Sequence, residues 1–171
     1  MPSLKKKSWR EKLADDKDLP KFVTLRGAAV QRWGGRTLVI GAPREIDGLM
    51  RTVPHGRVTT INEIRASLAR RHGADAACPI TTGIFSWIAA HAAEEAAAAG
   101  EKKITPYWRT LKKDGELNAK YPGGVAGVRR KLAAEGHAFV TKGKRTLVRD
   151  LDATLFQPST WQSSCPVTSA P

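Results

Sequence analysis

Apolar residues recur at helical spacing in the middle of the chain, and they predict two consecutive helices. The first begins at Thr60, which forms a capping box with Glu63, and ends near Gly73. The second runs from about residue 81 to residue 99 and ends at Gly100. One of its faces is apolar and is expected to lie in the core; it carries Ile80, Ile84, Trp87, Ile88 and His91.

Shorter elements are predicted on the N-terminal side. A capping box of Ser8 and Glu11 indicates a polar helix from Trp9 to about residue 17. The next segments have the composition of strands, a glycine turn and a helix opened by Pro43 and stopped by Pro54. In chain order they are residues 22–25 (strand), 33–36 (turn), 37–40 (strand) and 43–53 (helix).

The C-terminal side predicts a β wing and a small helix. Residues 110–117, with Asp114-Gly115 at the turn, are typical of a wing. A short amphipathic helix follows and ends at Gly136, and residues 139–148 predict a final hairpin. From Gln157 onward the composition is polar and rich in proline, which favours disorder.

Two helices joined by a short turn and followed by a β wing are typical of a winged helix-turn-helix. We therefore expect an α+β fold, mainly α, with a small N-terminal β element and a C-terminal hairpin. Residues 1–42 are expected to form a basic helix and the β element, residues 43–156 the winged-helix domain, and residues 157–171 a disordered tail.

Charge narrows the class of partner. The 171 residues include 29 Lys and Arg against 16 Asp and Glu, a net charge of +13. Such an excess favours a polyanion, because binding to nucleic acid releases counterions. The cations are spread along the chain and do not form one basic amphipathic helix, so double-stranded DNA is preferred to a membrane surface. No apolar run approaches the length of a bilayer span.

Cysteine and histidine usage excludes other classes of site. Cys78 and Cys165 are the two cysteines, which is too few for a disulfide framework and points to the cytoplasm. The four histidines show no metal-ligand spacing with each other or with the cysteines. We expect no metal and no cofactor.

Four short motifs point to one family of DNA-binding domains. They occur in order at residues 53–60 (VPHGRVTT), 106–109 (PYWR), 123–124 (GG) and 135–136 (EG). Together, over about residues 46–148, they resemble the DNA-binding domain of the alkylguanine-DNA alkyltransferases. That family transfers an alkyl group from guanine to a cysteine, which is activated by a histidine and, through water, by a glutamate.

The alkyl-transfer relay is broken at two of its three positions. Tyr107 stands where the family has its cysteine and Trp108 where it has its histidine, whereas Glu135 fits the carboxylate. A phenol with a pKa near 10 accepts an alkyl group poorly at neutral pH, and an indole is no base. The resemblance therefore implies the alkyltransferase-like subgroup, in which an aromatic residue replaces the cysteine. Its members flip an alkylated base and hand it to excision repair.

The resemblance also implies site residues and partners. We expect double-stranded DNA, possible excision-repair partners and a monomer. Arg109 matches the family arginine, with a structural role. Thr82 stands where the family has an intercalating arginine, Ile61 where it has a tyrosine that pushes on the phosphate, and Pro122 where it has a small hydroxyl residue. The predicted base pocket comprises Tyr107, Trp108, Arg109, Tyr121, Gly123 and Gly124; the predicted DNA contacts are Arg57, Thr59, Thr60, Arg65, Thr81, Thr82, Ser86, Arg129 and Arg130.

Several alternatives stay open at this point. Tyr107 and Trp108 also suit an aromatic pair that fills the core, and Glu135 also suits a cap or an ion pair with an arginine. Cys78 precedes a helix N-terminus, so an active methyltransferase or another base-repair enzyme with a different nucleophile is one alternative function. A small buried apolar side chain is the other interpretation of Cys78. A winged-helix transcriptional regulator is the remaining function.

Overall fold

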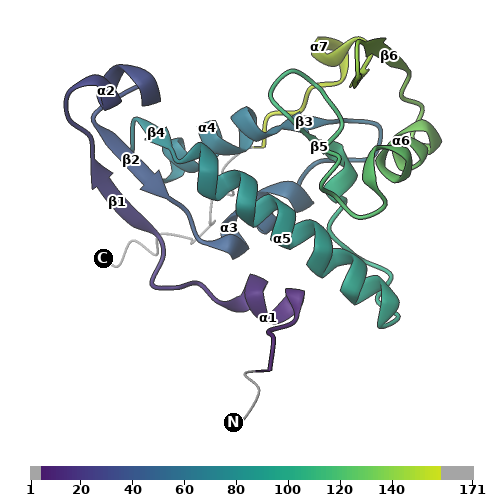
Figure 1. The fold of residues 1–171 in the computed structure, drawn as a ribbon, viewed down its shortest axis with the longest axis horizontal. Helices are drawn as coiled ribbons and strands as arrows, with labels where there is room; N and C mark the ends of the chain where they lie inside the picture. The colour runs from purple at the N-terminus through teal and green to yellow at the C-terminus, as the bar shows by residue number, and fades with distance from the viewer. Residues whose placement is uncertain (1–4, 159–171) are drawn as a thin grey trace, which may run out of the picture.

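The computed structural model describes residues 5–158 and is organised around one long helix, α5 (Pro79–Ala98). Three helices pack against it: α1 (Trp9–Ala14), α3 (Pro43–Arg51) and α4 (Ile61–His72) (Figure 1). The helix pair α4 and α5, joined by residues 73–78, is the predicted helix-turn-helix. The mixture of helices and small sheets confirms the expected α+β class.

A three-stranded sheet links the N-terminal segment to the helix-turn-helix. Strand β1 (Lys21–Thr24) runs antiparallel to β2 (Thr37–Ile40), and β2 runs parallel to the short β4 (Ala76–Ala77). Because β4 lies between α4 and α5, residues 1–42 and 43–156 share this sheet. Helix α2 (Ala28–Trp33) fills the connection for which the sequence predicted only a turn.

Local caps fix the helix ends, and these were predictable. Ser8 and Glu11 form both hydrogen bonds of the capping box at the start of α1. Thr60 accepts from the Glu63 amide at 3.4 Å at the start of α4. At its other end, α4 stops at Gly73, whose φ of 61° lies in the left-handed region that favours glycine.

The wing is assembled from three separate segments. Strand β3 (Thr59–Thr60) pairs in parallel with β5 (Thr110–Leu111), and the hairpin consists of β6 (Phe139–Lys142) and β7 (Arg145–Val148). Residues 110–117 turn back at Asp114-Gly115, where the Lys112 amide donates to the Glu116 carbonyl at 3.0 Å, but the two sides do not pair as strands of a hairpin. Instead Glu116 bridges to Leu147 of β7. Arg145 holds this arrangement with ion pairs to Asp114 and Glu116, at 3.0 and 2.9 Å.

The remaining elements are a 3-10 helix and two α-helices in the C-terminal half of the chain. The 3-10 helix η1 (Tyr107–Arg109) precedes β5, α6 (Gly124–Ala134) lies beside η1, and α7 (Leu151–Thr154) follows β7 (Figure 1). None of the helices within residues 5–158 has both the length and the apolarity to cross a membrane. Apart from residues 157 and 158, the tail expected to be disordered lies outside the described residues.

The predicted core face of α5 is wrong in part. Ile88 is buried, but the side chains of Ile80 and Ile84 are 62% and 46% exposed. The helix instead buries its alanine-rich side and two hydroxyl residues, Thr82 and Ser86. Small side chains let α3 and α4 approach α5 closely. The hydroxyls lose no hydrogen bonds there, because each donates to the carbonyl four residues earlier at 2.7 Å.

Candidate functional site

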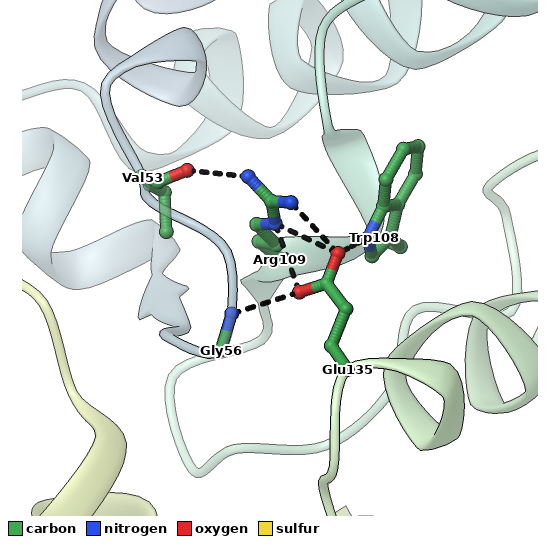
Figure 2. A network of polar contacts seen from close by, with 5 residues as sticks. All are labelled: Val53, Gly56, Trp108, Arg109 and Glu135. Carbon is green, nitrogen blue, oxygen red and sulfur yellow. Dashed lines mark hydrogen bonds and ion pairs between the residues drawn. The ribbon is translucent and has the colours of Figure 1, made fainter.

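Glu135 lies at the centre of a polar cluster that joins three distant segments (Figure 2). It caps the C-terminus of α6, and one carboxylate oxygen, Oε1, accepts from the indole Nε1 of Trp108 at 2.8 Å. Its other oxygen accepts from the backbone amide of Gly56 at 3.2 Å. The carboxylate thus ties the loop of residues 53–57 to η1 and to α6.

Arg109 completes the cluster as the counter-ion of Glu135. Its Nη2 and Nε donate to Glu135 Oε1 at 2.8 and 3.0 Å, and Nε also lies 3.0 Å from Oε2. The remaining nitrogen, Nη1, donates to the Val53 carbonyl at 2.8 Å (Figure 2). The two side chains are only 13% and 6% exposed, so this is a buried, multiply hydrogen-bonded ion pair. The interpretation of Glu135 as an ion-pair partner is therefore the one that the structure supports.

These contacts decide what the carboxylate does chemically. Burial on its own would raise the pKa of Glu135, but hydrogen bonds from Arg109, Trp108 and Gly56 outweigh it and lower the pKa below its ordinary value. A carboxylate with a lowered pKa, already bonded to three donors, is a poor proton acceptor. Glu135 is therefore suited to holding the fold and unsuited to general base catalysis.

Tyr107 lies in the core beside this cluster. Its side chain is 1% exposed and its hydroxyl donates to Oε1 of Glu94 on α5 at 2.6 Å. Burial, followed by the bond to Glu94, raises the pKa of Tyr107 above its ordinary value. Its ring meets Trp108 and Tyr121 edge to face, with centroids 5.3 and 5.6 Å apart. The phenol stays protonated at neutral pH and is no nucleophile.

The predicted base pocket is not an open cavity at Tyr107. Tyr121 is also buried, and the indole of Trp108 is half-buried with the Lys131 ammonium 4.8 Å from its ring. Gly123 has a φ of 80°, and a Cβ there would lie 3.2 Å from the Gly127 Cα. The aromatic side chains thus fill the space between α5, η1 and α6, as the core-filling alternative predicted.

An open groove of about 500 Å³ lies along the exposed first half of α5. One wall is the first half of α5 and the other is the segment that follows β5. Its lining residues are Ile80, Gly83, Ile84, Trp87, Lys112, Asn118, Ala119 and Lys120. The sequence motifs gave no signal for this groove, because its residues come from the helix face that was expected in the core and from a loop.

Comparison with solved structures gives two matches, both of low sequence identity. A crystal structure of the S. pombe alkyltransferase-like protein in complex with DNA shares 17% identity and a TM-score of 0.49, covering 68% of this chain and 94% of that chain. A second structure, S. pombe Atl1 in complex with damaged DNA containing O6-carboxymethylguanine, shares 18% identity and a TM-score of 0.43 over the same shares of both chains. No family model and no curated protein matches the sequence.

Of the four arginines predicted to contact DNA, three are exposed and one, Arg65, is already hydrogen-bonded within the protein. Arg129 and Arg130 on α6 are exposed, and so is Arg57, which donates to the Leu155 carbonyl at 2.8 Å. Arg65 is half-buried and donates to the Ala77 carbonyl at 2.9 Å and to Asn62 at 3.2 Å. Its guanidinium holds β4 against α4, which leaves less of it for a phosphate.

The predicted hydroxyl contacts are corrected by their burial. Thr59, Thr60, Thr82 and Ser86 are buried, so their side chains do not present a DNA-binding surface. Thr60 caps α4, while Thr59 belongs to β3 and pairs with Thr110 of β5. Thr81 is half-buried. A hydroxyl residue was expected at the surface because it is polar, but short hydroxyls that bond to the backbone are well suited to tight helix packing.

Cys78, the other candidate nucleophile, lies in the core. Cys78 is buried at the start of α5, where its amide donates to the Val39 carbonyl at 2.9 Å. Within residues 5–158, no three His, Cys, Asp or Glu side chains lie close enough together to hold a metal ion.

Removing the Tyr107 hydroxyl is expected to destabilise the protein modestly. A Tyr107→Phe variant loses one hydrogen bond to a charged acceptor and should unfold with about 1–2 kcal/mol less free energy in a urea titration followed by circular dichroism. Glu94 keeps its ion pair with Lys131 at 3.7 Å, so the carboxylate is not left without a partner. A variant as stable as the wild type would show that the Tyr107–Glu94 bond contributes nothing net.

Proposed function

We propose that this protein binds DNA in the manner of an alkyltransferase-like protein: it recognises alkylated or otherwise damaged bases and does not transfer the alkyl group. The claim that no alkyl group is transferred is supported by the residues that stand at the relay positions. The nucleophile position holds a buried tyrosine bonded to Glu94, and Glu135 is neutralised by Arg109. A nucleophile and its base are both missing, and alkyl transfer by the family mechanism needs both.

The first half, DNA binding, is supported by unpaired positive charge. Within residues 5–158, many exposed cations have no acidic partner within 4.0 Å; they include Arg57, Lys113, Lys120, Arg129, Arg130, Lys142, Lys144 and Arg149, besides others in the N-terminal segment, on α4 and at residues 102–103. Helix α6 and the β6–β7 hairpin contribute four of these, and the two elements meet where the Arg129 guanidinium lies 5.2 Å from the Phe139 ring. Free cations of this kind neutralise phosphates and release counterions.

The alternatives of an enzyme and of a sequence-reading regulator have less support. Cys78, the candidate nucleophile, is buried. A regulator reads purine edges best with Arg, Asn or Gln on its recognition helix, but α5 exposes Ile80 and Ile84. A protein that binds a lesion and leaves it in place requires other proteins to remove it. We therefore include excision-repair proteins as partners, with this protein acting as a monomer in the cytoplasm.

Titration of fluorescent duplexes tests this proposal. A duplex with one O6-methylguanine should bind about tenfold or more tightly than the matched guanine duplex, a difference of about 1.4 kcal/mol or more. Intact mass of the protein after incubation with excess methylated DNA should stay unchanged. Equal affinities for the guanine duplex and for several lesion types would leave a general DNA binder. A mass increase of one methyl group would replace the proposal with the enzymatic alternative.

A further inference from the structure

One face of α5 is apolar along its length but only half covered. Four side chains at helical spacing make up this face: Ile80, Ile84, Trp87 and His91. Helix α1 covers the second half through Trp9, whose ring is 4.8 Å from the Trp87 ring and stacks on His91 at 4.5 Å. The first half is left bare, with Ile80 and Ile84 exposed. Among residues 5–158, the large apolar side chains with comparable exposure are Phe22 and Val23 on β1.

The surroundings of the two isoleucines select the class of partner. Both line the groove of about 500 Å³, and the charged residues in its lining are Lys112 and Lys120, with no acidic residue. Lys112 is paired with Glu116 at 3.1 Å, whereas Lys120 is free. Exposed apolar side chains beside cations fit a ligand that is apolar inside and anionic outside. A DNA duplex has this structure, because stacked bases lie between two lines of phosphates.

We infer that Ile80 and Ile84 form an apolar wedge that enters the base stack of bound DNA from α5. The inference rests on the proposed function, because it takes duplex DNA as the ligand. Branched apolar side chains that insert between base steps unstack them and kink the duplex, and the burial of the side chains offsets part of the unstacking cost. Thr82, which aligns with an intercalating arginine, is buried and not available for this role.

The wedge accounts for an otherwise unfavourable choice of residues. Two exposed isoleucines at the start of a helix contribute nothing to the core, and their exposure promotes aggregation. Lysine or glutamate at both positions would be compatible with the same fold. Insertion into DNA gives the two side chains a buried environment in the complex that the free protein lacks.

The fluorescence of 2-aminopurine tests the wedge directly, since this base brightens when it is unstacked. A duplex with 2-aminopurine beside the O6-methylguanine should brighten on binding to the wild type. The double variant Ile80→Ala/Ile84→Ala should bind much more weakly and, at concentrations that saturate the duplex, should leave the probe dark. Affinity should fall by roughly fourfold for each buried methylene removed, so Ile84→Val loses about fourfold and Ile84→Ala more than tenfold.

Two control variants separate a wedge from loss of folding or of charge. Phe22→Ala removes a similarly exposed apolar side chain from β1 and should change neither affinity nor probe brightness. Lys120→Ala should weaken binding and reduce the salt dependence, but bound DNA should still brighten. The isoleucine variants should keep the wild-type salt dependence, because they remove no phosphate contact. Circular dichroism and urea titration establish that all variants are folded.

The outcomes distinguish the wedge from the proposed function. Wild-type binding that prefers the lesion without any brightening, or with brightening that survives in the double isoleucine variant, overturns the wedge and leaves the proposed function standing. If the wild type binds none of the duplexes, the proposed function and the wedge both fail. Preference for the lesion, brightening in the wild type and a dark complex with the double variant support both.

Discussion

Replacing Glu135 by alanine is expected to lower the free energy of unfolding by about 3–5 kcal/mol. The substitution leaves the buried guanidinium of Arg109 without its counter-ion and removes the acceptor of the Trp108 indole and of the Gly56 amide. The penalty comes mainly from the uncompensated charge, because burying an ion without a partner costs more than a buried pair gains. Urea unfolding followed by tryptophan fluorescence and circular dichroism measures it.

An exposed ion pair provides the matched control for Glu135. Glu101→Ala removes the partner of Arg10, and both of those side chains are about half exposed, so the loss should stay below about 1 kcal/mol. A double Arg109→Leu/Glu135→Leu variant should cost less than the sum of its two single variants, because the double variant leaves no buried charge without a partner. An effect of Glu135→Ala as small as that of Glu101→Ala would contradict the assignment of a buried, stabilising pair.

The pH dependence of stability gives the same prediction a second readout. The folded-state pKa of Glu135 is lowered, so its contribution is complete above the unfolded pKa of about 4.3 and is lost as the pH falls through the folded value. Wild-type stability should therefore decline on acidification below about pH 5. The Glu135→Gln variant should show a shallower decline over the same range.

The parts of the fold that local chemistry decides were predictable from the sequence. Caps at Ser8 and Thr60 are short-range, so both helix starts were placed correctly. Strands β1 and β2 are also within one residue of their predicted positions. Helix α2 was missed because its six residues have no cap and no buried side chain to mark it. The wing was misassigned because β5 pairs with β3, about fifty residues away, and turn residues alone do not encode that pairing.

The orientation of α5 was not predictable from periodicity. Two stripes of this helix are compatible with a core, one of large apolar residues and one of alanine, threonine and serine. Hydrophobicity favours the first stripe, but the structure buries the second together with Phe85 and Ile88, on the side that packs against α3 and α4. The same reversal buries Thr82 and Ser86 and exposes Ile80 and Ile84. The sequence pattern thus located the second helix of the helix-turn-helix correctly but assigned the wrong face of it to the core.

The candidate site was predictable by position, and its structural role was one of the two interpretations that the sequence left open. The motifs selected Trp108, Arg109 and Glu135, and these three do lie together. Glu94, which accepts from Tyr107, comes from an alanine-rich tract that carried no motif. In place of a relay that activates a nucleophile, the same positions now form an ion pair and an aromatic cluster that stabilise the joint between α5, η1 and α6. A large loss of stability in Glu135→Ala is what this change of role predicts.

Affinity for duplex DNA is expected to fall by roughly 1,000-fold between 50 and 200 mM monovalent salt, for about five or six neutralised phosphates. The unpaired cations on α6, on the hairpin and at Lys120 can neutralise about this many phosphates. Arg65 is not needed, because its guanidinium already donates to the Ala77 carbonyl. Arg129→Ala and Arg130→Ala should each reduce the slope of log affinity against log salt by about 0.9. Both substitutions should weaken binding to damaged and undamaged duplexes equally, because phosphates carry no information about the lesion.

Lys7→Ala is the control for this effect, because Lys7 is an exposed cation already paired with Asp15 at 2.8 Å. It should leave the salt slope within the error of the wild type. Anisotropy titrations at four salt concentrations, with both the guanine and the O6-methylguanine duplex, measure the slopes. A flat wild-type slope would contradict phosphate neutralisation as the source of affinity. Parallel slopes for the two duplexes would show that uncharged contacts distinguish the damaged base from guanine. The exposed side chains of Ile80 and Ile84 on α5 are candidates for such contacts.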